Sequence, residues 1–373
     1  AKAAKDGAGL DRVLVLPTGN PPHKHDVTPA EDRWRMVCAA VAQQDGLEPC
    51  RMEMDRTGVI YTVDTLKILH EMYPRADFYY IIGADTLLDL KNWRHYEQVL
   101  GMCSFLICPR LGASQPAEVT EERHRLTAMG GSFSTVDMDV VDVSSTQVRR
   151  ALSQGRPTPG LPVVCREYAG LCGLYGMRPR LNRPQAWLEK LFRDLTAKRF
   201  SHTLAVAHTA RHLANLHGVD AHKAEEAAVL HDCAKCLPVK EMQRICRQQH
   251  LTEDEQVLSS GALMHSLVGA YLAAEEYGEQ DPDVLRAIAC HTTGKVGMTR
   301  LDMVVYLADK IEPTRESYPT LEKVRMLAQL NLERALLASM EGTRAFVRKG
   351  GKPLHPQTLE TMAWLKENIK TGT

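Results

Sequence analysis

The chain has 373 residues, of which 44% are apolar, and its 46 lysines and arginines balance 46 aspartates and glutamates. At a typical domain size of about 150 residues, this length predicts two domains, each able to bury an ordinary core. The charge balance excludes the general positive field on which non-specific nucleic-acid binding depends, so we expect no nucleic-acid partner.

Ten cysteines are scattered without the spacing of a disulfide framework, which is typical of a reducing cytosol. No apolar stretch approaches the roughly 20 residues of a membrane span, and no signal peptide is recognisable. We therefore expect a cytoplasmic protein without a membrane partner, and the composition is compatible with a homo-oligomer. Because the first residue is alanine, we also expect the sequence to be a fragment or a processed chain.

Short apolar runs alternate with helical patterns through the first half of the chain. The runs at 12–16, 78–82, 104–108 and near 132–140 have the length and continuity of strands in a buried parallel sheet. Helical patterns separate them, beginning with residues 30–44. This alternation predicts an α/β domain with a doubly wound, Rossmann-like sheet.

Polar residues follow two of these predicted strands. His23 and Lys24 lie in a proline-rich loop after the first strand and offer donors to a phosphate. Gly83 and Asp85 follow the strand at 78–82, at the edge where open α/β sheets bind nucleotides. A rigid loop and a Gly-Asp turn explain the same residues without a ligand.

A second anion site is predicted where a helix begins near residue 144. Ser145 and Thr146 lie at this start, where hydroxyl groups cap the helix and backbone amides stay free for an anion. Arg149 follows one turn later. An ordinary N-cap explains the hydroxyl groups, but it does not explain the arginine pair at 149 and 150.

Four motifs of this half resemble those of the nicotinate-nucleotide adenylyltransferases: Pro17-Thr-Gly-Asn-Pro-Pro-His-Lys24, Tyr61-Thr-Val-Asp-Thr65, Gly83-Ala-Asp85 and Val143-Ser-Ser-Thr-Gln-Val-Arg149. The resemblance covers residues 1–176 and implies a nucleotidyltransferase of NAD biosynthesis. Such an enzyme transfers an adenylyl group from ATP, bound with Mg²⁺, to nicotinate mononucleotide, giving deamido-NAD and pyrophosphate. By this resemblance, the nicotinate nucleotide would contact Tyr61, Thr62, Asp85 and Trp93. ATP would be held by Gly83, Asp85, Ser145, Thr146 and Arg149.

The chain departs from this family in one respect. The family begins with a strand, a Gly-Gly-Thr-Phe loop and a His-x-Gly-His motif, and neither motif occurs here. The absent strand would be central, so its loss removes the imidazoles that stabilise the departing pyrophosphate and leaves two neighbouring strands without hydrogen-bond partners. We therefore expect an interrupted sheet with an open nucleotide cleft, and no adenylyl transfer by this chain as it stands.

A basic, proline-bearing segment at 177–184 predicts a short linker, so the second domain covers residues 185–373. We expect this domain to be compact and all-α. Its predicted helices are 185–196, 199–217, 220–235, 238–249, 252–259, 264–277, 281–291, 299–312, 319–341 and 355–370.

Polar residues fall on the apolar faces of several of these helices. His231 and Asp232 interrupt an apolar run, where a buried imidazole beside a carboxylate is costly unless a metal binds both. Other positions of this kind are His202, His265, His291 and Asp309. A satisfied core residue explains one such position, but five helices with inward-facing polar residues are better explained by a metal site.

The order of these positions, with the flanking stretch Ala308-Asp-Lys-Ile-Glu-Pro313, resembles the HD-domain metal-dependent phosphohydrolases. Within that group it is similar to the bacterial symmetrical diadenosine tetraphosphate hydrolases, over residues 184–370. The metal ligands implied by this resemblance are His202, His231, Asp232 and Asp309. Further groups that would bind a second metal, the substrate or its phosphates are Arg199, Lys235, His265, His291, Thr292 and Arg315.

The four implied ligands combine nitrogen and oxygen donors, which suits iron first, or manganese, cobalt or zinc, and is too rich in nitrogen for calcium. Such a metal lowers the pKa of a bound water and directs it at phosphorus. The implied reaction cuts diadenosine tetraphosphate into two molecules of ADP. The ligand set does not select the substrate, so an HD-domain nucleotidase, an alarmone hydrolase and a non-catalytic ADP-sensing module stay as alternatives.

Two further patterns lie close to these residues. Cys233 and Cys236 form a Cys-x-x-Cys, but no second pair for a zinc knuckle is nearby, so we interpret the spacing as coincidence. His208 and His212 are four residues apart and lie off the helical stripe of His202. We expect both on the solvent side of their helix.

Overall fold

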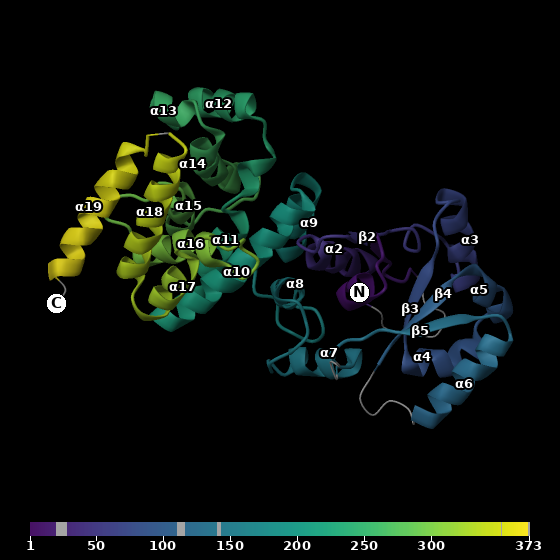
Figure 1. The fold of residues 1–373 in the computed structure, drawn as a ribbon. Helices are drawn as coiled ribbons and strands as arrows, with labels where there is room; N and C mark the ends of the chain where they lie inside the picture. Colours follow the sequence, from purple (N-terminus) through teal and green to yellow (C-terminus); the bar gives the residue numbers. More distant parts are fainter. Residues whose placement is uncertain (20–27, 110–115, 140–142, 352, 372–373) are drawn as a thin grey trace. The chain divides into compact units, whose positions relative to one another are not determined.

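The chain divides into two compact units, residues 1–162 and 163–373 (Figure 1). The residues that the computed structural model describes are 1–19, 28–109, 116–139, 143–351 and 353–371. The predicted phosphate donors His23 and Lys24 lie outside them. Across the part described, no helix combines the length and apolarity that crossing a bilayer requires.

The first unit combines short parallel strands with helices. Its strands are β1 (Val13–Val15), β2 (Leu47–Pro49), β3 (Tyr79–Gly83), β4 (Ser104–Cys108) and β5 (Ser132–Thr135). Its helices are α1 (Lys2–Gly7), α2 (Ala30–Val41), α3 (Thr62–Met72), α4 (Ala84–Asp89), the 3₁₀ helix η1 (Leu90–Asn92), α5 (Tyr96–Met102), α6 (Pro116–Ala128) and α7 (Ser145–Ser153). The predicted α/β class with parallel strands is confirmed.

The strands of this unit form two separate sheets within the described residues. β1 pairs with β2, and β4 lies between β3 and β5, always in parallel. This division agrees with the expected interruption of the sheet. β2 was not predicted, because three residues that include Glu48 and Pro49 carry no apolar alternation, and the strand expected near 132–140 ends at Thr135.

The core of the first unit lies between the three-stranded sheet and helices α3 to α6. Phe105, on the central strand β4, is fully buried and stacks on Phe133 of β5 with ring centroids 5.0 Å apart. Leu87 and Leu126, from α4 and α6, are also fully buried in this cluster. The register of β3 and β4 places Gly83 opposite Cys108, so the carboxyl ends of both strands lie at the same edge.

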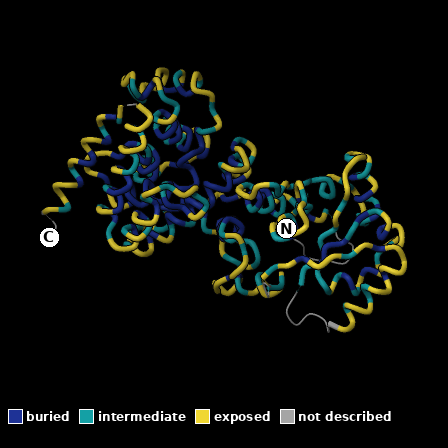
Figure 2. The backbone as a smooth tube through the Cα atoms, in the orientation of Figure 1, coloured by how far each residue is buried: buried dark blue, intermediate teal, exposed yellow. Residues whose placement is uncertain are grey.

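The second unit is entirely helical in its described residues. Its elements are α8 (Val163–Cys172), α9 (Pro184–Asp194), α10 (Ala197–His217), α11 (Ala221–Leu230), the 3₁₀ helix η2 (Cys233–Cys236), α12 (Val239–Gln248), α13 (Glu255–Leu258), α14 (Gly261–Glu275), α15 (Pro282–Cys290), α16 (Arg300–Ile311), α17 (Leu321–Leu330), α18 (Leu332–Lys349) and α19 (Pro356–Thr371). Helices α10, α11, α15 and α16 pack together, and Figure 2 shows long buried segments along them. The predicted all-α domain is confirmed.

Two predicted helices have different ends in the structure. The helix expected over 319–341 is two helices, because Asn331 adopts an extended conformation and its side chain accepts a hydrogen bond from the backbone amide of Arg334, which caps α18. The helix expected over 220–235 ends at Leu230. His231 and Asp232 therefore lie in the turn between α11 and η2.

The boundary between the compact units lies 14 residues before the predicted domain boundary at 176. Helix α8 belongs to the helical unit, where Tyr168 packs against Phe200 of α10 with ring centroids 6.4 Å apart. The predicted linker 177–184 is also held there, because the Arg180 guanidinium forms ion pairs with the buried carboxylates of Glu167 and Glu225, the latter at 2.8 Å. These buried ion pairs restrict the segment 177–184, although its composition alone suggests a flexible linker.

Substituting Phe105→Ala is expected to lower the free energy of unfolding of the first unit by about 3–5 kcal/mol, because it removes a fully buried ring and leaves a cavity beside Phe133. Chemical denaturation followed by far-ultraviolet circular dichroism measures this loss. Tyr79→Ala, on β3 and 44% exposed, is the control and should cost far less. Equal losses in the two variants would contradict the assignment of Phe105 to the core.

Candidate functional site

Six polar side chains meet in the interior of the helical unit, although they are spread over more than 100 positions of sequence. None is more than 6% exposed. They are His202 on α10, His231 and Asp232 after α11, His265 on α14, His291 after α15 and Asp309 on α16. The structure thus brings together all the inward-facing positions that the sequence indicates.

His202, His231, Asp232 and Asp309 form one side of this cluster. Nε2 of His202 lies 3.1 Å from Oδ1 of Asp309 and 3.9 Å from Oδ2 of Asp232. Nε2 of His231 lies 3.4 Å from the same Asp232 oxygen and 3.8 Å from Oδ1 of Asp309. These are separations that atoms bound to one cation would have.

His265 and His291 form the other side, around the second oxygen of Asp232. Oδ1 of Asp232 lies 3.3 Å from Nε2 of His265 and 3.9 Å from Nε2 of His291. The two imidazole nitrogens are 3.0 Å apart, and the hydroxyl of Thr292 lies 3.4 Å from Nε2 of His265. Asp232 is therefore shared by two groups of donor atoms, one at each carboxylate oxygen.

Helix ends orient two of the imidazoles. His231 and His291 each follow the last residue of a helix, and their Nδ1 atoms donate to the carbonyl oxygens of Ala228 and Ile288, both at 2.7 Å. A proton on Nδ1 leaves Nε2 with a free lone pair that points into the cluster. This is the tautomer that a metal ligand needs.

The cluster fits a divalent cation. Nε2 of His231 is buried without a hydrogen-bond partner among the described residues, which is costly unless a cation binds it. The donor atoms of His202, His231 and Asp232 lie within 4.8 Å of one another, as do those of Asp232, His265 and His291. Mixed imidazole and carboxylate donors suit iron, manganese, cobalt or zinc.

The protonation states also favour cation binding. Burial acts to raise the pKa of Asp232, but His231 and His265 outweigh it and hold this pKa well below its usual range. Burial likewise opposes ionisation of Asp309, and Lys310 and His202 overcome it, so its pKa is also well below the ordinary value. Burial lowers the pKa values of His265 and His291. Near neutral pH these carboxylates are ionised and these two imidazoles are neutral.

Basic side chains surround the carboxylates. Nη1 of Arg199 lies 2.7 Å from Asp232, and Nη2 of Arg315 lies 3.5 Å from Asp309. Lys310, which the sequence analysis did not select, lies 2.8 Å from the other oxygen of Asp309. Burial lowers the pKa of Lys235, whose charge acts on Asp232 from a greater distance.

The other sequence patterns of this unit contribute no donor atom to either ligand group of the cluster. His212 is exposed, and His208 is half-buried with Nδ1 3.3 Å from Glu167. Cys233 and Cys236 are free thiols, and Cys236 donates to the backbone carbonyl of Cys233 at 3.3 Å.

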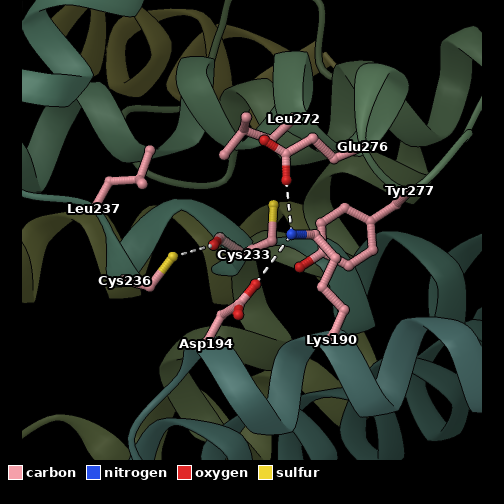
Figure 3. A pocket seen from close by; sticks show the side chains of 8 residues that line it. All are labelled: Lys190, Asp194, Cys233, Cys236, Leu237, Leu272, Glu276 and Tyr277. Carbon is pink, nitrogen blue, oxygen red and sulfur yellow. Dashed lines mark hydrogen bonds and ion pairs between the residues drawn. The ribbon is translucent and has the colours of Figure 1, made fainter.

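The two cysteines line a separate pocket of about 300 Å³ (Figure 3). Within it the ammonium of Lys190 is paired with Asp194 and Glu276, at 3.0 and 2.7 Å. The charged groups of this pocket therefore satisfy one another, and none of the predicted metal ligands lines it.

In the first unit, two of the predicted nicotinate-binding residues, Thr62 and Trp93, contact the aromatic residue Tyr80. The Tyr80 ring packs edge-on against Trp93, with centroids 5.6 Å apart, and its hydroxyl is hydrogen-bonded to the Thr62 side chain. Tyr61 precedes α3, and the guanidinium of Arg94 lies 4.5 Å from the centre of its ring. Arg94 is a further cation that the sequence analysis did not select, although it directly follows Trp93.

The predicted ATP-binding residues lie at the starts of two helices. Gly83 ends β3 and precedes α4, and a Cβ atom there would lie 2.5 Å from Oδ1 of Asp85, so a larger residue would require the Asp85 side chain to turn away. Ser145, Thr146 and Arg149 are exposed on α7. The cap of α7 is Ser144, in a reciprocal capping box with Gln147.

Comparison with known proteins divides the chain in the same two parts. Residues 1–151 match the cytidylyltransferase-like family, and residues 199–314 match the HD domain. A "Bis(5'-nucleosyl)-tetraphosphatase, symmetrical" of Bacillus subtilis is 42% identical over 50% of this chain and 98% of that protein. A "Probable nicotinate-nucleotide adenylyltransferase" of Desulfitobacterium hafniense is 37% identical over 47% of this chain and 86% of that protein.

One relative combines both parts. A "Probable nicotinate-nucleotide adenylyltransferase/Ap4A hydrolase" of Mycoplasma genitalium is 26% identical to this chain and is matched over 93% of each protein. The two units therefore occur in the same order in another single polypeptide.

Removing metal from the protein with a chelator and adding back Mn²⁺ is expected to raise the Tm of the helical unit. At a hundredfold excess over the Kd, binding stabilises by about 2.7 kcal/mol, or about 5–10 °C for a unit of this size. Differential scanning calorimetry measures the shift.

Asp232→Asn should abolish most of this shift, because Asp232 contributes to both groups of donor atoms. His212→Ala, which changes an exposed histidine, is the matched control and should keep it. A shift of equal size in Asp232→Asn and in the unaltered protein would contradict the assigned cation site.

Proposed function

We propose that this chain is a bifunctional nucleotide enzyme. Its carboxyl-terminal half belongs to the symmetrical bis(5'-nucleosyl)-tetraphosphatases, and its amino-terminal half belongs to the nicotinate-nucleotide adenylyltransferases. The helical unit would hydrolyse diadenosine tetraphosphate symmetrically to two molecules of ADP. The observation that supports this most directly is the buried convergence of four histidines and two aspartates beside basic side chains.

His202, His231, Asp232 and Asp309 are the proposed ligands of a divalent metal, with iron as the first to test. When bound there, the metal supplies Lewis-acid chemistry that makes a water more acidic and a phosphate more electrophilic. Asp232 and Asp309 hold the negative charge that this requires, and Asp309 is kept in place by Lys310. His265, His291 and Thr292 would receive phosphate oxygens or a second cation at the other oxygen of Asp232.

The charge of the site favours a polyphosphate over a neutral ester. Four basic residues lie around the carboxylates: Arg199, Lys235, Lys310 and Arg315. With a divalent cation added, the region is strongly positive, which stabilises the charge that develops on a chain of phosphates as one bond breaks. Arg199 and Arg315 present guanidinium groups, the geometry suited to phosphate oxygens.

Three alternatives remain, two of them hydrolases and one a non-catalytic module. An HD-domain nucleotidase or an alarmone hydrolase would use the same metal cluster on a different nucleotide. An ADP-sensing module would bind the nucleotide without turning it over. Products and metal dependence distinguish all of these from the proposed reaction.

In the first unit, we propose the nucleotide-binding surfaces of an adenylyltransferase that transfers an adenylyl group from Mg²⁺-ATP to nicotinate mononucleotide. Because the Gly-Gly-Thr-Phe loop and the His-x-Gly-His motif do not occur in the sequence, we expect the chain as it stands to bind these nucleotides without transferring the adenylyl group. Tyr61, Thr62 and Trp93 would contact the nicotinate nucleotide, which is supported by the contacts of Thr62 and Trp93 with Tyr80 and by the Arg94 guanidinium over the Tyr61 ring. ATP would bind at the carboxyl end of β3 and the start of α7, through Gly83, Asp85, Ser145, Thr146 and Arg149. An exposed helix start with an arginine one turn in suits a phosphate.

His231→Ala is expected to reduce metal-dependent hydrolysis of diadenosine tetraphosphate by at least about a hundredfold, because even residues that only support metal ligands contribute 10–100-fold. Chromatography of the products after incubation with Fe²⁺ or Mn²⁺ measures both rate and cleavage position. His212→Ala, an exposed histidine of α10, should retain the full rate.

The products decide among the candidate functions. ADP alone supports symmetrical cleavage, whereas AMP with ATP would contradict it. Turnover of other nucleotides without turnover of the tetraphosphate favours a nucleotidase or an alarmone hydrolase. Nucleotide binding without turnover in any metal favours the sensor.

Trp93→Ala is expected to raise the Kd for nicotinate mononucleotide about 5- to 150-fold, the equivalent of about 1–3 kcal/mol of stacking on a base. Isothermal titration calorimetry of the unaltered chain and the variant measures this without requiring turnover. Trp93→Phe should recover part of the affinity, and ATP affinity should stay constant in both variants. An unchanged Kd in Trp93→Ala would remove this residue from the proposed site.

A further inference from the structure

A buried carboxylate that belongs to none of the proposed ligands lies against His202. Oε1 of Glu312 is 3.0 Å from Nδ1 of His202, and Glu312 is 1% exposed. Since a carboxylate only accepts hydrogen bonds, the His202 proton that occupies this contact must lie on Nδ1. Nε2 of His202 lies 3.1 Å from Oδ1 of Asp309. A cation bound between these two atoms would take the place of a proton on Nε2 and receive the Nε2 lone pair.

This arrangement distinguishes His202 from the other imidazoles of the cluster. His231 and His291 donate from Nδ1 to backbone carbonyls, whereas His202 donates to a side-chain carboxylate. A carboxylate partner carries a full negative charge and raises the basicity of the imidazole, which strengthens its bond to a cation. His202 also lies in the second turn of α10, far from the carboxyl end where a helix has free carbonyls.

Glu312 is itself held rigidly. Its second oxygen accepts a hydrogen bond from the backbone amide of Thr314 at 2.5 Å. The guanidinium of Arg325, on α17, donates to the backbone carbonyls of Ile311 and Glu312 at 3.0 and 2.9 Å. The end of α16 is thereby fixed from both sides, so the carboxylate can fix His202 in turn.

We infer that Glu312 is a positioning residue of the metal centre: it holds the proton of His202 on Nδ1 and turns Nε2 toward Asp309 and the cation. This inference rests on the proposed metal site. Glu312 is not one of the proposed ligands, and its oxygens are held by His202 and Thr314, so its effect should reach the reaction only through metal affinity. Supporting residues of this kind contribute about 10–100-fold to metal binding.

Equilibrium dialysis of chelator-treated full-length chain against buffered Mn²⁺, with metal measured by mass spectrometry, tests this without any substrate. Glu312→Gln keeps an oxygen that accepts from Nδ1 but loses the charge, and we expect about tenfold weaker binding. Glu312→Ala loses both, and we expect about a hundredfold. Glu322→Gln is the matched control, because Glu322 pairs with the same Arg325 but is exposed to solvent, and its affinity should equal that of the unaltered chain.

The order of affinities separates positioning from a purely structural role. If the role of Glu312 is purely structural, metal-free Glu312→Ala should have a lower Tm, and both Glu312 variants should bind Mn²⁺ with an affinity within twofold of that of the unaltered chain. That result would overturn the inference and leave the metal centre intact. If the unaltered chain takes up no Mn²⁺ and no Fe²⁺, the proposed metal centre fails and the inference fails with it. A graded loss from glutamate to glutamine to alanine supports it.

Discussion

A carboxylate buried between two groups of imidazoles is the interaction on which the helical unit depends. Asp232 is 2% exposed. Removing an ionised carboxylate from water costs several kcal/mol unless hydrogen-bond donors or a cation offset this loss of hydration. One oxygen faces His202 and His231, and the other faces His265 and His291. Because both oxygens are engaged on opposite sides, the helices that carry these residues must converge around this one side chain.

Local structure at helix ends makes this convergence possible. Helix α11 ends at Leu230, so His231 and Asp232 leave the helical ladder and can turn into the cluster. Asp309 lies in the last turn of α16, a helix whose start is fixed by a capping box between Thr299 and Asp302. Free carbonyls at helix ends orient two imidazoles, and a carboxylate orients His202 within α10, so rigid secondary structure supplies the precision that a metal site requires.

The two units present their candidate residues in different ways. In the helical unit the proposed ligands are buried and already in contact, so the site is preorganised. In the first unit Ser145, Thr146 and Arg149 lie exposed on α7, and Trp93 is only partly buried. A buried site can polarise a reacting group without competition from water, whereas an exposed one depends on the ligand to complete it.

The sequence by itself determined the fold class of both units, the strand at 104–108 and the six polar positions of the cluster, because periodicity and residue type are local properties. Resemblance to two families came from the same short motifs. Only the tertiary structure decided that Asp232 is shared, that α8 and the segment 177–184 pack with the helical unit, and that Glu312 orients His202. These three features depend on contacts between residues as far as 110 positions apart. The packing of helices sets the distances between such residues, and no local sequence pattern encodes that packing.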